Sequence, residues 1–301
     1  MTNEDKFIKE RYGLKNQNEA LNTFKIRAAR EKQLEWWIDR EQELKIWRNI
    51  IKESVSLNKN FIVLIIGSYG RGKTLALYKV VDEAEKHKEI YPVFLNFKGE
   101  EKSKPGLDFI FRIFKNINFS ELIKNRTDKD LRNAIGSIPQ DFEEAKNILE
   151  RIVFDEPSNS SPNLFPRKTK SQKTKVRSEI NKLALFFLRG EIRPNASQLK
   201  QLGVIRKIEN TDIAKEYLSA ILYFVKNLGY KALLLAIDEF EYLFSLVSKS
   251  QQSIYVALLR SLYDFPPGRS VETEDIANMV YFIAISEDGW NSLKEMERKE
   301  T

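Results

Sequence analysis

Residues 61–77, FIVLIIGSYGRGKTLAL, decide the fold. Residues 61–66 are all apolar and mostly β-branched, which predicts a strand buried on both faces. After them, Gly67, Gly72, Lys73 and Thr74 satisfy the pattern G-x-x-x-x-G-K-[ST], and apolar residues then recur at helical spacing. A strand, this loop and a helix in that order predict a P-loop.

A P-loop binds phosphate because its glycines let consecutive backbone N–H groups point at the same oxygen atoms, at the positive end of a helix. Lys73 would contact the β- and γ-phosphates, and the hydroxyl of Thr74 would bind Mg²⁺. We expect these positions to contact the nucleotide: Gly67, Ser68, Tyr69, Gly70, Arg71, Gly72, Lys73, Thr74 and Leu75. The alternative is a chance glycine-rich turn, which the flanking strand and helix disfavour.

A second apolar run, residues 232–237, ends in Asp238 and Glu239. This form is typical of a Walker B strand, in which the first acid holds the hydration shell of Mg²⁺ and the second polarises the attacking water. Two acids at the end of a buried strand are costly unless a cation or a donor lies near them. We therefore predict Asp238 as a metal ligand and Glu239 as a catalytic residue, with a solvated strand end as the alternative.

Two more strands and one helix are predicted around these motifs. The runs YPVFLNF (91–97) and MVYFIAIS (279–286) predict strands, and Ser286 at the end of the second is a candidate catalytic residue. Because many strands end in serine, a simple polar strand end is the alternative. Residues 35–55, EWWIDREQELKIWRNIIKESV, have apolar residues at steps of three and four, which predicts an amphipathic helix with Asp39 as its N-cap.

Composition excludes several kinds of chemistry. The chain of 301 residues has no cysteine, which rules out disulfides, zinc thiolates and cysteine catalysis. Its one histidine, His87, lies in the charged stretch DEAEKHKE and is expected to be a solvated helix residue. No apolar run approaches the ~20 residues of a membrane helix, and the charged start MTNEDKFIKERYG does not resemble a signal peptide. We therefore expect no membrane contact and a cytoplasmic location.

The basic charge of the chain is concentrated in one segment. Residues 167–182, RKTKSQKTKVRSEINK, hold seven basic residues and one acid, a net +6 of the chain's +7. Such a segment can contact DNA phosphates, or it can be a solvated loop, and it lacks the interleaved aromatic residues that stack on bases. Residues 125–128, NRTD, resemble the guanine-reading motif of GTPases, but they precede the Walker B strand instead of following it. Adenine, and therefore ATP, is the expected base.

We divide the chain into four parts. Residues 1–35 are predicted to be an N-terminal helical segment, and residues 36–100 the first part of an ATPase core with the Walker A loop. Residues 101–226 are predicted to be a mainly helical insertion with a flexible basic loop at about 156–177, because serine, asparagine and proline dominate the start of that loop. Residues 227–301 would complete the core with Walker B and the strand that ends at Ser286. The predicted fold is α/β, a parallel sheet flanked by helices.

Five segments together resemble the additional-strand superfamily of P-loop ATPases, which includes the AAA+ and STAND classes. They are GSYGRGKT, FLRGE (187–191), NLGYKALLLAIDEFEYL (227–243), LLRSLYDFPPG (258–268) and YFIAISED (281–288). They are most similar to the P-loop ATPases of BREX-type phage defence and their archaeal relatives. The DREQEL at 39–44 is also similar to the helix that packs near adenine in origin-recognition and signalling ATPases.

The resemblance implies roles that the residues alone do not give. It implies a strand between the two Walker strands, with Ser286 as the sensor that contacts the γ-phosphate or water. After Ser286 the sequence holds too few residues for the helical lid of that family, so the second sensor and the arginine finger are expected from elsewhere. Arg260 and Arg298 are candidates for the finger, and a solvated arginine is the simpler interpretation of both.

The sequence therefore predicts an Mg²⁺-dependent ATPase that acts on or with DNA in a phage-defence or DNA-transaction complex. It would work as a homo-oligomer or beside a partner ATPase subunit. The alternative is a STAND-type switch, in which bound nucleotide controls assembly with an effector and turnover is incidental. A scaffold that has lost hydrolysis is disfavoured, because Lys73, Thr74, Asp238 and Glu239 are all present.

Overall fold

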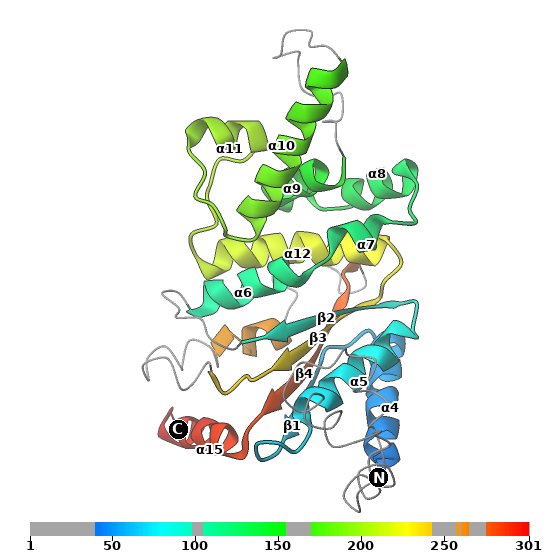
Figure 1. Ribbon diagram of the computed structural model, residues 1–301, viewed down its shortest axis with the longest axis vertical. Coiled ribbons are helices and arrows are strands. Elements are labelled where there is room, and N and C mark those ends of the chain that lie inside the picture. Colours follow the sequence, from blue (N-terminus) through cyan, green and yellow to red (C-terminus); the bar gives the residue numbers. More distant parts are fainter. Residues whose placement is uncertain are drawn as a thin grey trace, which may run out of the picture.

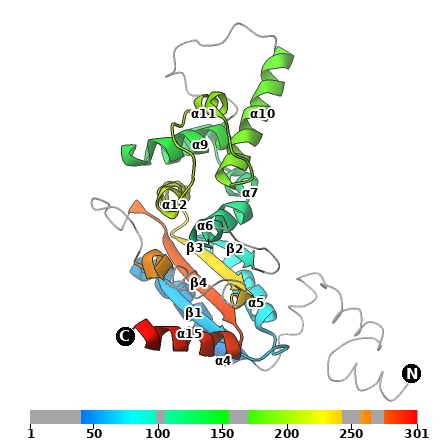
Figure 2. The same ribbon diagram turned by 90° about the vertical axis from the view of Figure 1, so that its left-hand side faces the viewer.

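The computed structural model describes residues 40–97, 105–154, 170–242, 257–258, 260–264 and 275–300. A parallel sheet forms one end of the molecule, and layers of helices extend from one of its faces (Figures 1 and 2). The N-terminal segment predicted at 1–35 lies outside the described residues. Within the described part, no helix is long and apolar enough to cross a membrane.

The sheet has four strands in the order β1-β4-β3-β2, and all neighbours are parallel. Their bounds are β1 Phe61–Ile66, β2 Ile90–Asn96, β3 Ala232–Asp238 and β4 Asn278–Ile285. β4, the last strand in the sequence, pairs with β1 from Phe61↔Val280 to Ile66↔Ile285 and with β3 along its other side. The expected strand between the two strands that carry the predicted Walker motifs is therefore confirmed.

The predicted burial of β1 on both faces is wrong. Ile62, Leu64 and Ile66 are 37%, 38% and 42% exposed, and only Ile65 of this strand is buried. β1 is the edge of the sheet and pairs only with β4 among the described strands. One set of its side chains, which includes Ile65, joins a core under two helices, whereas the other set lacks such a cover.

Two helices cover the face of the sheet to which Ile65 belongs. They are α4 (Glu41–Leu57), which precedes β1, and α5 (Lys73–Glu85), which follows the glycine-rich loop. Trp47 of α4 meets Phe282 of β4 edge to face, with ring centroids 6.3 Å apart. The predicted N-cap Asp39 is wrong, because α4 begins one residue later, with Arg40 at its N-cap and no side-chain capping hydrogen bond.

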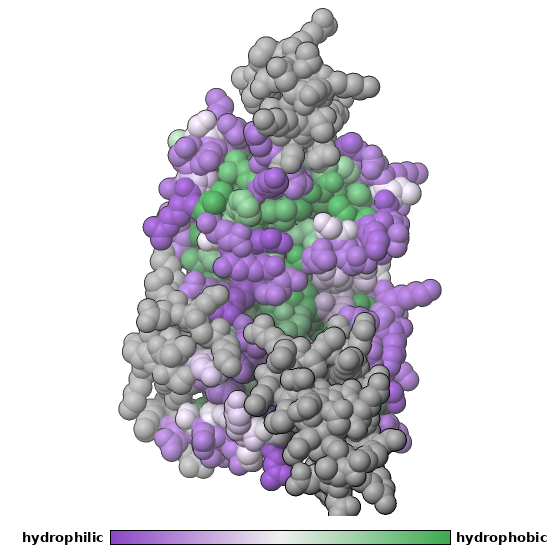
Figure 3. Space-filling view, in the orientation of Figure 1, coloured by the Kyte–Doolittle hydropathy of each residue, from purple (hydrophilic) through white to green (hydrophobic). Residues whose placement is uncertain are grey.

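The opposite face is covered by α6 (Pro105–Asn116) and α12 (Thr211–Asn227), and further helices stack on α12 (Figure 2). These are α7 (Phe119–Ile123), α8 (Asp128–Gly136), the 3₁₀ turn η1 (Gln140–Phe142), α9 (Glu143–Val153), α10 (Lys170–Leu188) and α11 (Ala196–Leu202). The described residues between β2 and β3 thus contain helices and no strand. On the face drawn in Figure 3, apolar residues gather over these helical layers, between rows of polar ones.

Two local predictions can be compared with these helices. α10 begins at Lys170, so residues 170–177 are helical and not part of a loop as predicted; the rest of that loop, up to 169, lies outside the described residues. The motif-like NRTD is a helix start, because the hydroxyl of Thr127 accepts the N–H of Asp130 and the Asp130 carboxylate accepts the N–H of Thr127. This capping box gives residues 125–128 a structural role at the start of α8, so no guanine-reading role is needed to account for them.

A buried carboxylate joins α4 to α5. Glu83 of α5 is only 3% exposed, and Arg48 of α4 donates to its two oxygens at 2.7 and 3.2 Å. Lys86 donates to Glu83 at 2.6 Å. Burial alone would raise the pKa of Glu83, but the hydrogen bonds from Arg48 and Lys86 outweigh it and lower the pKa to about 2. The charged form is therefore part of the α4–α5 contact.

We expect Glu83→Gln to lower the free energy of unfolding at pH 7, by on the order of 2 kcal/mol. Because the pKa of Glu83 falls from 4.5 to about 2 on folding, its contribution is complete above pH 4.5 and disappears as the pH falls toward 2. Urea denaturation across this range should show a shallower acid loss for the variant than for the native chain. Glu53→Gln, an exposed change on α4, is the control, and equal pH profiles for the native chain and Glu83→Gln would contradict the expectation.

Candidate nucleotide site

The glycine-rich loop lies at the carboxyl ends of β1 and β4. The N–H of Gly67 donates to the carbonyl of Ile285 at 3.3 Å, which ties the start of the loop to the end of β4. Gly70 and Gly72 both have φ of +79°, in the left-handed region that glycine adopts without a side-chain clash, and Gly72 is the N-cap of α5. The loop therefore delivers the chain into the N-terminus of α5, where backbone N–H groups favour anions.

Lys73 and Thr74, the first two residues of α5, point in different directions. Nζ of Lys73 donates to the carbonyls of Gly67 and Ser68 at 2.9 and 3.2 Å, within the loop itself. Oγ1 of Thr74 donates to Oδ2 of Asp238 at 2.8 Å, across 164 positions of sequence. The fold therefore brings together the hydroxyl and the carboxylate that the sequence predicts as metal ligands.

The two acids after β3 have unusual surroundings. Asp238 is 3% exposed, and burial raises the pKa of its carboxyl against the lowering effects of Thr74, the N–H of Glu239 and Lys73. The N–H of Glu239 donates to Oδ1 of Asp238 at 3.0 Å. Glu239 has φ of +55°, a region that non-glycine residues rarely adopt. Such strain is found at functional sites more often than elsewhere, which fits the catalytic role predicted for Glu239.

Ser286 lies between β4 and α15 (Glu287–Glu300) and starts that helix. Its Oγ accepts the N–H of Gly289 at 3.1 Å, and its carbonyl accepts the N–H of Trp290 at 2.9 Å. The next residue, Glu287, accepts a hydrogen bond from the hydroxyl of Ser68 in the loop at 3.0 Å. The end of β4 thus lies beside the loop, but the Ser286 hydroxyl is engaged as a helix cap.

The other predicted contact residues differ in exposure. Tyr69 is 94% exposed, and Gly70 and Arg71 are also exposed, whereas Ser68 and Leu75 are half-buried. The segment that carries Arg260 contacts Asn60, which precedes β1, through the carbonyl of Tyr263, so it lies at the opposite end of β1 from the loop. The side chain of Arg298 lies outside the described residues.

Two further residues adjoin the site: Arg40, which belongs to the DREQEL stretch whose resemblance implied a place near adenine, and Asn96, for which no role was predicted. A Cβ placed on Gly72 would lie 3.8 Å from Nη1 of Arg40, so this guanidinium adjoins the loop. Asn96, the last residue of β2, is paired in register with Asp238. Asn96 could have been proposed in the same way as Ser286, because both are polar residues at the end of an apolar strand.

The oxygen donors at this edge of the sheet fit Mg²⁺. Thr74 offers a hydroxyl and Asp238 a carboxylate, and Mg²⁺ takes one or two such ligands together with phosphate oxygens and water. No group of three or more histidine, cysteine or acidic residues that could hold a metal ion by themselves occurs in the described ranges. The donor set therefore suits a metal that arrives with a nucleotide.

Comparison with known proteins finds a family match for part of the chain. Residues 167–273 match the family model described as BREX system ATP-binding protein BrxC/D, which confirms the resemblance to the ATP-binding proteins of BREX phage defence. The matched range contains Asp238 and Glu239 and does not include the loop at 67–74. The family suggests ATP binding and a role in phage defence. No curated protein and no solved structure matches the chain.

The contact of α15 with the Walker B segment can be tested at Gly289. A Cβ at this position would lie 2.8 Å from Cβ of Glu241 and 3.0 Å from Cγ1 of Ile285. We expect Gly289→Ala to lower the free energy of unfolding by about 1–3 kcal/mol, because α15 must shift. Gly136→Ala is the matched control, since a Cβ there has no neighbour within 4 Å and alanine favours the helix. Equal urea midpoints for the two variants would show that α15 does not pack as described.

Proposed function

We propose that this chain binds ATP with Mg²⁺ and hydrolyses it, in the manner of an AAA+-like P-loop ATPase. The observation that carries the proposal is the hydrogen bond of 2.8 Å between Thr74 and Asp238. It places the start of the α5 helix, with its anion-binding N–H groups, beside a buried carboxylate and next to Glu239. Phosphate binding, metal binding and water activation need these three groups at one place.

Each residue has a role that follows from its position. Lys73 would leave the loop carbonyls for the phosphates, because an anionic oxygen is a stronger acceptor of an ammonium N–H than a neutral carbonyl is. Thr74 and Asp238 would hold Mg²⁺, which neutralises phosphate charge when bound. Glu239 would accept a proton from the water that attacks the γ-phosphorus. Ser286 would contact the γ-phosphate or that water once its hydroxyl leaves the N–H of Gly289.

We further propose that the protein acts on or with DNA as part of a cytoplasmic phage-defence complex. α10 begins within the basic segment 167–182 and projects from the helical layers at the end of the molecule remote from the sheet (Figure 1). DNA bound there would be distant from the nucleotide, so its effect on turnover would be transmitted through the helices or between subunits. We also propose that the protein self-associates or works beside a partner ATPase subunit.

The hydrolysis proposal is tested by steady-state ATP turnover with Mg²⁺. We expect Glu239→Gln to lower the rate by about 10²- to 10⁴-fold while ATP still binds, because it removes only the general base. Lys73→Ala should weaken ATP binding at least about tenfold, because it removes a charge-assisted contact to phosphate. Glu191→Gln, an exposed glutamate in the helical part, is the control. Full activity of Glu239→Gln would remove Glu239 from its proposed role.

The DNA proposal is tested by adding duplex DNA at several salt concentrations. We expect a several-fold rise in ATP turnover that weakens as salt increases, because phosphate contacts release counterions. Replacing Lys168, Lys170, Lys173 and Lys175 with glutamine should abolish the rise and leave the basal rate unchanged. If DNA has no effect and ATP instead causes oligomerisation with slow turnover, the nucleotide-controlled switch is the better account.

A further inference from the structure

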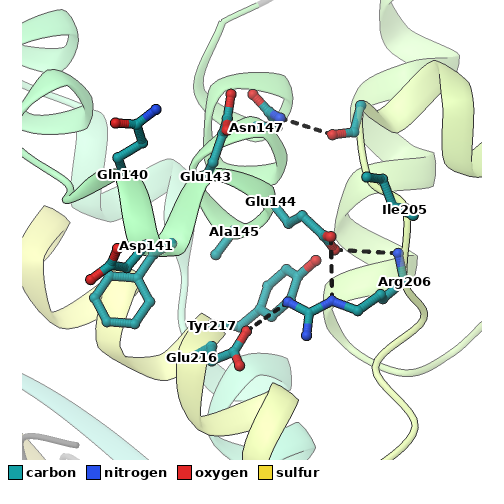
Figure 4. A pocket seen from close by; sticks show the side chains of 12 residues that line it. Gln140, Asp141, Glu143, Glu144, Ala145, Asn147, Ile205, Arg206, Glu216 and Tyr217 are labelled. Atoms are coloured by element: carbon teal, nitrogen blue, oxygen red, sulfur yellow. Dashed lines mark hydrogen bonds and ion pairs between the residues drawn. The ribbon is translucent and has the colours of Figure 1, made fainter. Parts of the chain in front are cut away.

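A cavity of about 350 Å³ lies in the helical layers, between α9 and the N-terminal half of α12 (Figure 4). It is open to solvent and is lined by η1 and the first turns of α9, by residues 203–206 after α11, and by the N-terminal half of α12. This volume is within the range of small-ligand sites. No part of the proposed ATP site contributes to it.

One guanidinium and two carboxylates form a hydrogen-bonded group on the wall of the cavity. Arg206 donates through Nε to Glu144 of α9 at 3.4 Å and through Nη2 to Glu216 of α12 at 3.0 Å. Its backbone N–H also donates to Glu144, at 3.3 Å. Figure 4 shows these contacts as one connected group on the wall of the cavity. The positive charge of Arg206 is therefore already matched by two negative ones.

Two more carboxylates lie at the cavity. Asp141 and Glu143 line it, are exposed to solvent, and form no ion pair within the described ranges. The lining thus carries four acids and one base, an excess of negative charge. Acids in the first turn of α9 also favour that helix, which is a structural reason for Glu143 and Glu144.

The hydroxyl of Tyr217, on α12, has no such structural explanation. Its side chain is 2% exposed, and its hydroxyl is buried with no hydrogen-bond partner. Figure 4 shows this hydroxyl turned toward Arg206 and Glu144, on the wall of the cavity. Burial, followed by the negative charge of Glu144, raises the pKa of Tyr217, so the phenol is neutral. A buried hydroxyl without a partner is unfavourable, and a bound hydrogen-bonding group would remove that cost.

We propose that this cavity binds an organic cation, an alkyl-ammonium or alkyl-guanidinium group. The excess carboxylates supply the opposite charge, and the phenol oxygen of Tyr217 accepts an N–H from the bound group. Ile205, which is 86% exposed at the cavity, offers an apolar contact for the alkyl part. An anion is disfavoured because the only guanidinium at the cavity already has two carboxylate partners.

The first experiment is calorimetric titration of the full chain with agmatine, which carries both an ammonium and a guanidinium, at low ionic strength. N-butylurea, a neutral analogue of an alkyl-guanidinium, is the matched ligand control. We expect agmatine to bind and butylurea not to bind. Agmatine binding should weaken as salt is added, because much of the attraction is between charges. Failure of agmatine to bind below about 10 mM, an affinity under 3 kcal/mol, would overturn the proposal.

Variants show whether binding occurs in this cavity. Tyr217→Phe should weaken agmatine binding about five- to tenfold, the value of one hydrogen bond. Its melting temperature should not fall, because the change removes a hydroxyl that has no partner in the free protein. Asp141→Asn should weaken binding while leaving the Arg206 contacts intact. Tyr263→Phe, at an exposed tyrosine outside the cavity, is the control; equal affinities of all variants would place agmatine elsewhere and overturn the proposal.

A capped tripeptide, acetyl-Ala-Arg-Ala-amide, distinguishes the two sources of such a cation. Tighter binding of the peptide than of agmatine would identify an arginine side chain of a partner protein as the natural ligand. Tighter binding of agmatine would identify a free amine. Either result supports a cation site, and the proposal does not depend on ATP hydrolysis.

Discussion

β4 hydrogen-bonds to β1 along one side and to β3 along the other, and the geometry of the candidate nucleotide site depends on this pairing. Gly67 at the start of the loop bonds to Ile285 at the end of β4, and Phe240, just after the Walker acids, bonds to Ala284. These bonds fix the loop and the two acids next to one another, at the carboxyl ends of the strands. Thr74 can therefore reach Asp238, although neither residue is near the other in sequence.

Each of the two candidate sites contains groups that are energetically unfavourable in the folded protein, and the groups differ between the sites. At the nucleotide site the cost lies in the burial of the Asp238 carboxyl and in the left-handed backbone of Glu239. In the helical layers it lies in the hydroxyl of Tyr217, which is removed from water without a partner. In both places a ligand of the right charge would lower the free energy of groups that the fold alone leaves unfavourable. Glu83, the other buried carboxylate described above, differs from them, because Arg48 and Lys86 of the same chain already match its charge.

The strands and the glycine-rich loop could be predicted from local sequence patterns, because each depends on residues that are close in sequence. The order of the strands came from the resemblance, since no periodicity shows which strands are neighbours. The burial of Ile62, Leu64 and Ile66 was wrongly predicted for the same reason. An edge strand and a central strand can have the same run of apolar residues, so the run does not show which of them β1 is. Helix propensity at Lys170 was hidden by charge and by the proline-rich stretch before it. The cavity at Tyr217 arises from packing between α9 and α12, and no motif in the sequence indicates it.

The position of β4 also has a consequence for how the protein is made on the ribosome. Asn60, just before β1, accepts the N–H of Met279, which is 219 positions later in the chain. During translation β1, the strand before the glycine-rich loop, emerges early, and its sheet partner β4 is made only after the described helical layers. Until then the backbone edge of β1 that pairs with β4 has no partner strand, and unpaired strand edges make nascent chains prone to aggregate or to need chaperones. The helical part, whose contacts are closer in sequence, can fold during that interval.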